Sequence, residues 1–183
     1  LGFDECLIKK AVQSYIGVRR RSEICLEKKY LTVIDDYGHH PTEIAATLKA
    51  IEQVYFDKRI IAVFQPHRYS RLKYSYEEFC IAFEYADEVL VSDVYAAGEE
   101  KDPSINLDDL ALSIEKKSLC SCSYVETENL IRDLKNKVVV DDVLVFFGAG
   151  SITKYAHQAA AYFENFPLKK IHVGLICGGE SPE

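Results

Sequence analysis

Residues 60–71 of the chain read IIAVFQPHRYSR, and this stretch decides the fold class. Its first part, Ile60–Phe64, is an unbroken apolar run, which is typical of a strand buried on both faces of a parallel sheet. Its second part, Gln65–Arg71, changes abruptly to polar, aromatic and cationic side chains. The stretch therefore predicts a central strand that ends in a loop equipped for chemistry.

Similar runs alternate with helical patterns on both sides of this strand. Apolar residues at helical spacing predict helices at Phe3–Tyr15, from Pro41 onward, near Arg71–Tyr85, and at Leu107–Lys117, Glu128–Lys137 and Ile152–Phe163. The predicted strands are Glu23–Glu27, Tyr30–Ile34, Ile60–Phe64, Glu88–Val94, Ser121–Val125, Val143–Phe147 and Ile171–Cys177. The first two strands are close enough to pair as a hairpin, and single helices between the others indicate right-handed βαβ units. We therefore expect an α/β fold with a mostly parallel sheet and flanking helices.

The composition excludes several classes of function. The 183 residues carry 22 basic and 29 acidic side chains, a net charge of −7, which argues against a nucleic-acid partner. The longest apolar runs are about five residues, so we expect no membrane partner. Six scattered cysteines without zinc spacing or a signal peptide indicate reduced thiols in the cytoplasm. The chain has no methionine and begins at Leu1, so we expect a piece of a longer protein.

Polar residues and glycines gather where the predicted strands end. Ligands of open parallel sheets bind outside the carboxyl ends of the strands, and these ends share one edge. The segments that follow the strands are residues 35–41 (DDYGHHP), 65–71 (QPHRYSR), 95–99 (YAAGE) and 148–151 (GAGS). Polar residues that only solvate the surface would be spread over both edges of the sheet. Their gathering at one edge therefore predicts a ligand site there.

The acids and histidines of the first segment allow several interpretations. Asp35 and Asp36 could bind a metal, accept ribose hydroxyls or cap the turn. Adjacent side chains point in different directions, so His39 and His40 do not form a joint zinc site. We expect one of the two histidines in the cleft and the other capping a helix or buried.

Arginines and glycines in the later segments also have two interpretations. Arg68 and Arg71 lie three residues apart and would share a helical face, where paired guanidinium groups bind carboxylate or phosphate. The alternative is salt bridging to the acidic helix at Glu77–Glu84. Gly148-Ala149-Gly150 predicts a tight turn with its backbone close to another group, and it lacks the third glycine of a dinucleotide fingerprint.

These segments carry a family resemblance. DDYGHHPTEI at residues 35–44, FQPHRYSR at 64–71, DVYAAGE at 93–99 and GAGSI at 148–152 resemble motifs of the UDP-N-acetylmuramate-L-alanine ligases, in the Mur ligase family. The stretch at residues 17–21 looks like the start of that family's carboxy-terminal domain, although Ser22 stands where the family usually has phenylalanine. Residues 173–183, VGLICGGESPE, are similar to the amino terminus of the D-alanine-D-alanine ligases.

The resemblance implies a fragment of an ADP-forming amide ligase of peptidoglycan precursor synthesis. In the family, ATP phosphorylates the muramic acid carboxylate of UDP-N-acetylmuramate, and L-alanine attacks the acyl phosphate. It implies residues 1–17 as the end of the central ATPase domain or a linker helix, 18–166 as the carboxy-terminal domain, and 167–183 as a linker and first strand of a fused D-alanine-D-alanine ligase domain. ATP and Mg²⁺ would be bound mainly by parts outside this fragment, which we expect to be inactive alone. The alternative is a non-catalytic ligand-binding or interaction domain of an unrelated α/β protein.

The resemblance also implies roles for single residues, and none of these roles is catalytic or metal-binding. Arg21 would reach the γ-phosphate of ATP and Asp36 its ribose. The residues implied around the incoming alanine are Tyr37, His39, His67, Arg68 and Arg71. Glu183 would contact the substrate of the second ligase.

Overall fold

The computed structural model describes residues 4–13 and 18–165. Its helices are α1 (Glu5–Gln13), α2 (Pro41–Val54), α3 (Tyr69–Tyr74), α4 (Tyr76–Ile81), α5 (Leu107–Ser118), α6 (Leu130–Lys137) and α7 (Ile152–Asn165), with a 3₁₀ turn, η1 (Thr127–Asn129). Its strands are β1 (Glu23–Lys28), β2 (Leu31–Asp36), β3 (Ile60–Phe64), β4 (Glu88–Val91), β5 (Ser121–Tyr124) and β6 (Asp142–Phe147). The predicted strand at Ile171–Cys177 and the boundary at residue 167 lie outside the described residues.

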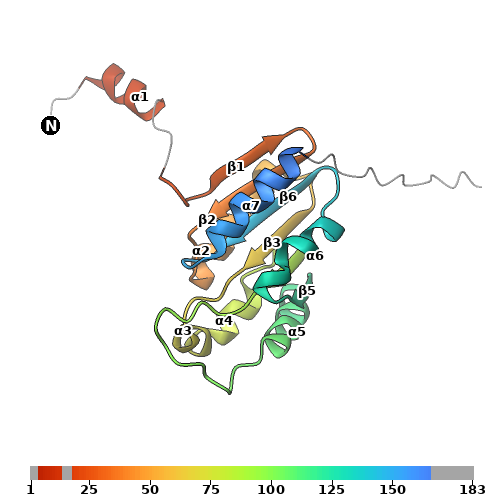
Figure 1. Cartoon of the computed structure of the whole chain (residues 1–183). Helices are drawn as coiled ribbons and strands as arrows, with labels where there is room; N and C mark the ends of the chain where they lie inside the picture. Colours follow the sequence, from red (N-terminus) through yellow and green to blue (C-terminus); the bar gives the residue numbers. More distant parts are fainter. Residues whose placement is uncertain (1–3, 14–17, 166–183) are drawn as a thin grey trace, which may run out of the picture.

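The strands form one sheet in the order β1-β2-β6-β3-β4-β5 (Figure 1). β1 and β2 make the predicted antiparallel hairpin, and every other neighbouring pair is parallel. The sequence prediction of an α/β fold with a mostly parallel sheet is therefore confirmed. The central strands β3 and β6 are buried along their whole lengths, as their unbroken apolar runs predict.

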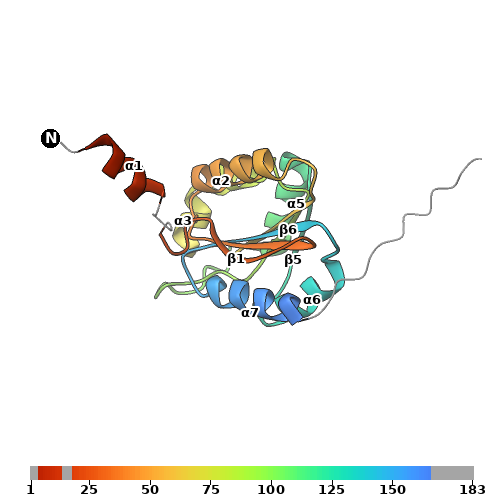
Figure 2. The same cartoon turned by 90° about the horizontal axis from the view of Figure 1, so that it is seen from above.

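Helices cover both faces of the sheet, so the domain has three layers. Seen from above, α2 and α5 lie on one face and α6 and α7 on the other (Figure 2). On the first face the rings of Phe79 and Phe83 lie 5.1 and 5.4 Å from that of Phe64. On the second face Phe146 packs among apolar residues of α6 and α7, including the buried Phe163. These two cores hold the sheet rigid beneath the loops at its edge.

Two elements differ from the sequence prediction. The helix expected near Arg71–Tyr85 is divided into α3 and α4, because the backbone leaves helical geometry at Ser75 (φ −107°, ψ 27°). After the break, the buried Phe79 of α4 packs on Phe64 of β3. The strand expected at Glu88–Val94 ends at Val91, since Asp93 turns away to bond with Thr127.

No helix in the two described ranges is long and apolar enough to cross a membrane.

Candidate functional site

The loops after β2, β3, β4 and β6 meet at one edge of the sheet. Asp36 of β2 and Phe64 of β3 both pair with Phe147 of β6, so these three strands end at the same level. Their arrowheads point to the same edge in Figure 1. The loop after β4 joins them through a single parallel bridge between His67 and Tyr95. The sheet thus brings together the four segments that the sequence singled out.

A row of rings, which we call the ring cluster, crosses this edge. It consists of Tyr37, His39, His67 and Tyr95. The ring of His39 lies 5.2 Å from that of Tyr37 and 5.6 Å from that of His67, both edge to face. The ring of His67 stacks on that of Tyr95 at 5.6 Å. Three separate loops therefore contribute to one aromatic surface, and Tyr95 remains 40% exposed on it.

Two arginines stand beside the ring cluster. Nη1 of Arg71 lies 3.4 Å from Nδ1 of His67. Because a guanidinium group only donates, this contact makes Nδ1 the acceptor and leaves the proton of a neutral His67 on Nε2. Burial lowers the pKa of His67, and the positive charges of Arg71 and Arg68 lower it further. His67 therefore presents a neutral imidazole with a hydrogen-bond donor.

Arg68 is held at this edge by a strained backbone. Its φ is +70°, a conformation that non-glycine residues rarely adopt. The backbone N–H of Arg68 donates to the Tyr95 carbonyl at 2.9 Å, which fixes the turn from which its side chain projects. Strain of this kind is retained where the surrounding structure requires it, often at functional sites.

The alternative of salt bridging to the acidic helix does not hold for these arginines. Within the described part of the chain, neither Arg68 nor Arg71 has a carboxylate within 4 Å. Glu77, at the start of α4, pairs with Lys117 instead. Both guanidinium groups are therefore available to an anion.

The histidine pair divides as expected, with one residue at the site and one at a helix end. The side chain of His40 caps α2, and its Nδ1 accepts a hydrogen bond from the Thr42 amide at 3.3 Å. His39 instead joins the ring cluster, with Nδ1 lying 3.0 Å from the Tyr37 carbonyl oxygen. Sequence position alone could not tell which histidine would take which role.

Glu43, which the sequence analysis did not single out, supports this loop. Its Oε2 accepts from the amides of His39 and His40 at 3.1 and 3.2 Å. The same oxygen lies 3.6 Å from Nδ1 of His39, and Oε1 lies 3.8 Å from Nη1 of Arg21. Burial raises the pKa of Glu43, but the two amide bonds outweigh it and bring the pKa below its usual value. A glutamate three residues after a helix cap was the signal that could have found it.

The carboxylates of Asp35 and Asp36, in contrast, are used within the fold. We call these two residues, with Arg20, Ser22 and Thr153, the carboxylate cluster. Asp36 is buried; Oδ1 accepts from the Gly38 amide at 2.7 Å, and Oδ2 accepts from the Ser22 amide at 2.7 Å. Of its three interpretations, the structure gives Asp36 the turn-capping role. A ribose hydroxyl would have to compete with these donors, so the ribose contact stays a prediction.

Asp35 connects the start of the domain to the β6–α7 turn. Its buried Oδ2 accepts from the Thr153 hydroxyl at 2.5 Å and lies 3.6 Å from Nε of Arg20. The other end of Arg20 donates from Nη2 to the Gly148 carbonyl at 2.6 Å. Burial raises the pKa of Asp35, while the Thr153 bond and the charge of Arg20 oppose the rise. Arg20 therefore has a structural role that its place in a short basic run did not reveal.

The Gly148–Ser151 turn lies close to its neighbours, as the sequence predicts. A Cβ at Gly150 would lie 2.6 Å from Oε1 of Gln65, so only glycine fits. Gln65 is buried; its Oε1 accepts from the Ile152 amide at 3.0 Å, and its Nε2 donates to the Ser151 hydroxyl at 3.2 Å. Gln65 thereby ties the start of α7 to the end of β3.

Two further features define the limits of the site. No group of three or more His, Cys, Asp or Glu in the residues that the structure describes could hold a metal ion.

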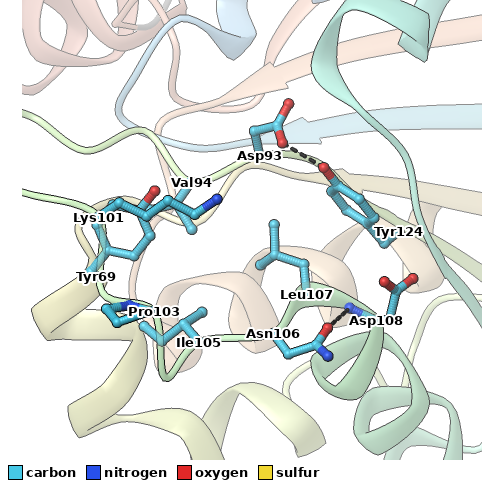
Figure 3. A pocket seen from close by; sticks show the side chains of 10 residues that line it. All are labelled: Tyr69, Asp93, Val94, Lys101, Pro103, Ile105, Asn106, Leu107, Asp108 and Tyr124. Atoms are coloured by element: carbon cyan, nitrogen blue, oxygen red, sulfur yellow. Dashed lines mark hydrogen bonds between the residues drawn. The ribbon is translucent and has the colours of Figure 1, made fainter.

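A separate cavity of about 470 Å³ opens between the loop after β4 and α5, where Lys101, Asn106 and Leu107 face Asp93 and Tyr124 (Figure 3). The Tyr124 hydroxyl donates to Asp93 at 2.6 Å across its wall. Both carboxylate oxygens of Asp93 therefore accept hydrogen bonds, from Tyr124 and from the Thr127 amide.

Comparison with known proteins gives consistent matches. The family described as "Mur ligase, glutamate ligase domain" matches residues 20–150. The "Bifunctional enzyme MurC/Ddl" of Chlamydia caviae is 42% identical over 182 residues, which are 100% of this chain and 22% of that protein. The "UDP-N-acetylmuramate--L-alanine ligase" of Persephonella marina is 40% identical over 166 residues, 90% of this chain and 36% of that protein. A crystal structure of UDP-N-acetylmuramate-alanine ligase MurC from Thermotoga maritima has a TM-score of 0.69 at 28% identity, and the match covers 89% of this chain and 34% of that one.

Glu183, predicted to contact the substrate of a second ligase, lies outside the described residues. Of the other predicted site residues, Tyr37, His39, His67, Arg68 and Arg71 meet at the edge. Arg21 lies next to them, with the carbon of its guanidinium group 5.6 Å from the centre of the Tyr37 ring. Only Asp36 is withdrawn into the interior.

Proposed function

The chain belongs to the Mur ligase family, and from this membership we propose that it is the carboxy-terminal domain of an ATP-dependent, ADP-forming ligase. The whole enzyme joins L-alanine to the carboxylate of UDP-N-acetylmuramate in the synthesis of peptidoglycan precursors. ATP phosphorylates that carboxylate, and the amine of alanine attacks the resulting acyl phosphate. An amide bond forms, the bond to phosphate breaks, and ADP and inorganic phosphate leave.

In this proposal the ring cluster and its arginines bind the amino acid. A carboxylate that leaves water needs planar, paired donors, and Arg68 and Arg71 offer them beside the neutral His67. The rings of His39 and Tyr37 form the wall on the side of Arg21, which reaches the phosphate. Closure of this domain over the other two excludes water, which would otherwise hydrolyse the acyl phosphate.

One observation carries the proposal. Arg68 and Arg71 have no carboxylate within 4 Å among the described residues, yet they stand beside a row of aromatic rings at the ligand-binding edge of the sheet. Cationic groups without an internal carboxylate partner at such an edge are available to an anionic ligand.

The described residues contain no group of three or more His, Cys, Asp or Glu that could hold a metal ion. The proposal therefore assigns no step of this domain to the metal. ATP and Mg²⁺ belong mainly to the central domain of the whole enzyme, with residues 1–17 as its end.

The parent protein is proposed to be bifunctional and cytoplasmic. Its second activity joins D-alanine to D-alanine, and residues 167–183 are the linker and first strand of that second ligase, with Glu183 near its substrate. The proposal rests on the residue pattern at 173–183 and on the match of the whole chain to a protein named as a bifunctional enzyme. The amino-terminal boundary of this domain is placed at residue 18.

The test is an assay of the full-length protein with MgATP, UDP-N-acetylmuramate and L-alanine. We expect phosphate release that depends on both UDP-N-acetylmuramate and alanine, and no release above background from the 183-residue chain alone. Activity of the isolated chain would contradict its assignment as a fragment without a complete active site. Absence of alanine-dependent release from the full-length protein would favour a non-catalytic ligand-binding domain.

A further inference from the structure

Glu43 stands between two side chains to which the proposed function gives different ligands. On one side, Oε1 of Glu43 lies 3.8 Å from Nη1 of Arg21, the group assigned to the phosphates. On the other side, Oε2 lies 3.6 Å from Nδ1 of His39, a group assigned to the amino acid. A single carboxylate therefore contacts both the side chain assigned to the phosphates and the side chain assigned to the amino acid.

Helix capping accounts for only half of this arrangement. The capping box needs one acceptor for the amide of His40, and Oε2 supplies it while it also accepts from the amide of His39. Capping does not require the second oxygen to face Arg21, nor does it require a negative charge. The placement of Oε1 is the feature that remains to be explained.

The contact with Arg21 is weak enough to be exchanged. The side chains of Arg21 and Glu43 are 55% and 37% exposed, and exposed pairs of this kind contribute about 1 kcal/mol or less. A polyphosphate carries several negative charges and accepts bidentate hydrogen bonds, so it competes effectively for the guanidinium group. When Arg21 turns to a phosphate, Glu43 keeps its position through the two amide bonds.

The charge of Glu43 then acts mainly on His39. Besides Glu43 on α2, the groups that face His39 are Tyr37 on its own loop and His67 on the loop after β3, with Arg71 behind His67. Among the described residues, Glu43 has the only carboxylate within 4 Å of a ring nitrogen of His39. When Arg21 no longer pairs with Glu43, the electrostatic environment of the His39 imidazole therefore changes.

We propose that Glu43 is a positioning residue that couples phosphate binding at Arg21 to the amino-acid side of the site through His39. The inference rests on the proposed function for the identity of the two ligands. Phosphate on Arg21 leaves the charge of Glu43 facing Nδ1 of His39 alone, and this holds the imidazole in the orientation that receives the amino acid. By thermodynamic reciprocity, an amino acid bound at His39 favours phosphate at Arg21.

The experiment uses the 183-residue chain and tripolyphosphate as the probe. The NMR signal of the His39 Cε1–H group is followed during the titration in the wild type, in Glu43→Gln and in Glu52→Gln. Glu43→Gln keeps an oxygen acceptor for the two amides and removes only the charge, while Glu52→Gln makes the same change later on α2. We expect a saturable shift of the His39 signal in the wild type and Glu52→Gln, and its loss in Glu43→Gln.

A second variant separates the coupling from local structure. Arg21→Gln removes the exposed phosphate-binding group without touching the helix cap, and we expect it to abolish the shift as well. An equal shift in the wild type and Glu43→Gln would overturn the inference, as would a shift that survives in Arg21→Gln. Absence of any shift in the wild type would also overturn it.

The full-length protein distinguishes this inference from the proposed function. We expect that a non-hydrolysable ATP analogue tightens alanine binding there by about two- to fivefold, and that Glu43→Gln removes this factor. Ligation without such coupling would refute the inference and leave the proposed function standing. A phosphate-dependent shift at His39, in a full-length protein without ligase activity, would refute the proposed function and leave the inference standing.

Discussion

The ring cluster and the carboxylate cluster both take residues from the end of β2 or the loop after it, yet they serve different purposes. Asp35 and Asp36 end β2 and are 0% and 3% exposed, and three of their four carboxylate oxygens accept hydrogen bonds from groups inside the fold. His39, three residues after Asp36, lies on the open edge of the sheet with its ring 5.6 Å from the ring of His67. Polar residues at a strand end can therefore either hold the site together or face a ligand. Burial and internal partners decide between these roles.

Among the substitutions that distinguish the two clusters, Asp36→Ala is expected to have the largest effect, and this effect is on the free energy of unfolding. This change leaves the buried amides of Gly38 and Ser22 without their acceptor. Hydrogen bonds to a charged group are worth about 1.5–3 kcal/mol each, so the free energy of unfolding should fall by about 3 kcal/mol. Urea denaturation of the 183-residue chain measures it. A loss below about 0.5 kcal/mol, as for an ordinary surface change, would place Asp36 outside the structural cluster.

The next effect belongs to the ring cluster. In the full-length protein, the proposed function predicts that Arg71→Ala raises the KM for alanine by about 30-fold, or about 2 kcal/mol, and leaves the KM for UDP-N-acetylmuramate nearly unchanged. Lys73→Ala is the control, because Lys73 is a cation on the same helix that pairs with Asp102. Equal effects of Arg71→Ala on both substrates would remove Arg71 from the alanine site.

A smaller effect of the carboxylate cluster appears in the pH dependence of stability. Burial raises the folded-state pKa of Asp35 above its usual 3.8, so the folded chain holds this proton more tightly than the unfolded chain. The contribution of Asp35 to stability therefore decreases as pH rises through 3.8 toward the folded-state pKa. Relative to Asp35→Asn, the wild type should lose stability as pH rises, in denaturation series at several pH values. A constant difference across the series would contradict this.

The ring cluster should show the smallest effect, with the opposite sign. The pKa of His67 is lowered from 6.5 by burial and by Arg71, so the unfolded chain binds the proton more tightly. The stability that depends on neutral His67 is lost as pH falls below 6.5. His67→Gln should flatten this decline in the same denaturation series. A decline that is unchanged in the variant would show that His67 does not cause it.

The sequence predicted the scaffold well because its signals are local. The apolar run at Ile60–Phe64 became β3 with the same bounds, and the four strand-end segments came together as expected. The division between α3 and α4 was not predictable, since it depends on where Phe79 meets Phe64 across the chain.

The roles of the two aspartates were also beyond the sequence. Asp35 and Asp36 look equivalent as a pair, and only the return of residues 20–22 to the end of β2 supplies their partners. Glu43 was missed because a capping glutamate is common, and its second oxygen meets Arg21 only in the folded loop.

The most direct test measures two quantities on the same pair of variants in the full-length protein. For Asp36→Ala and Arg71→Ala, the KM for alanine and the midpoint of urea denaturation are determined together. We expect Asp36→Ala to lower the denaturation midpoint, and Arg71→Ala to raise the KM for alanine with a midpoint close to that of the wild type. A loss of stability in Arg71→Ala without any change in the KM for alanine would contradict the assignment of the ring cluster as the amino-acid site.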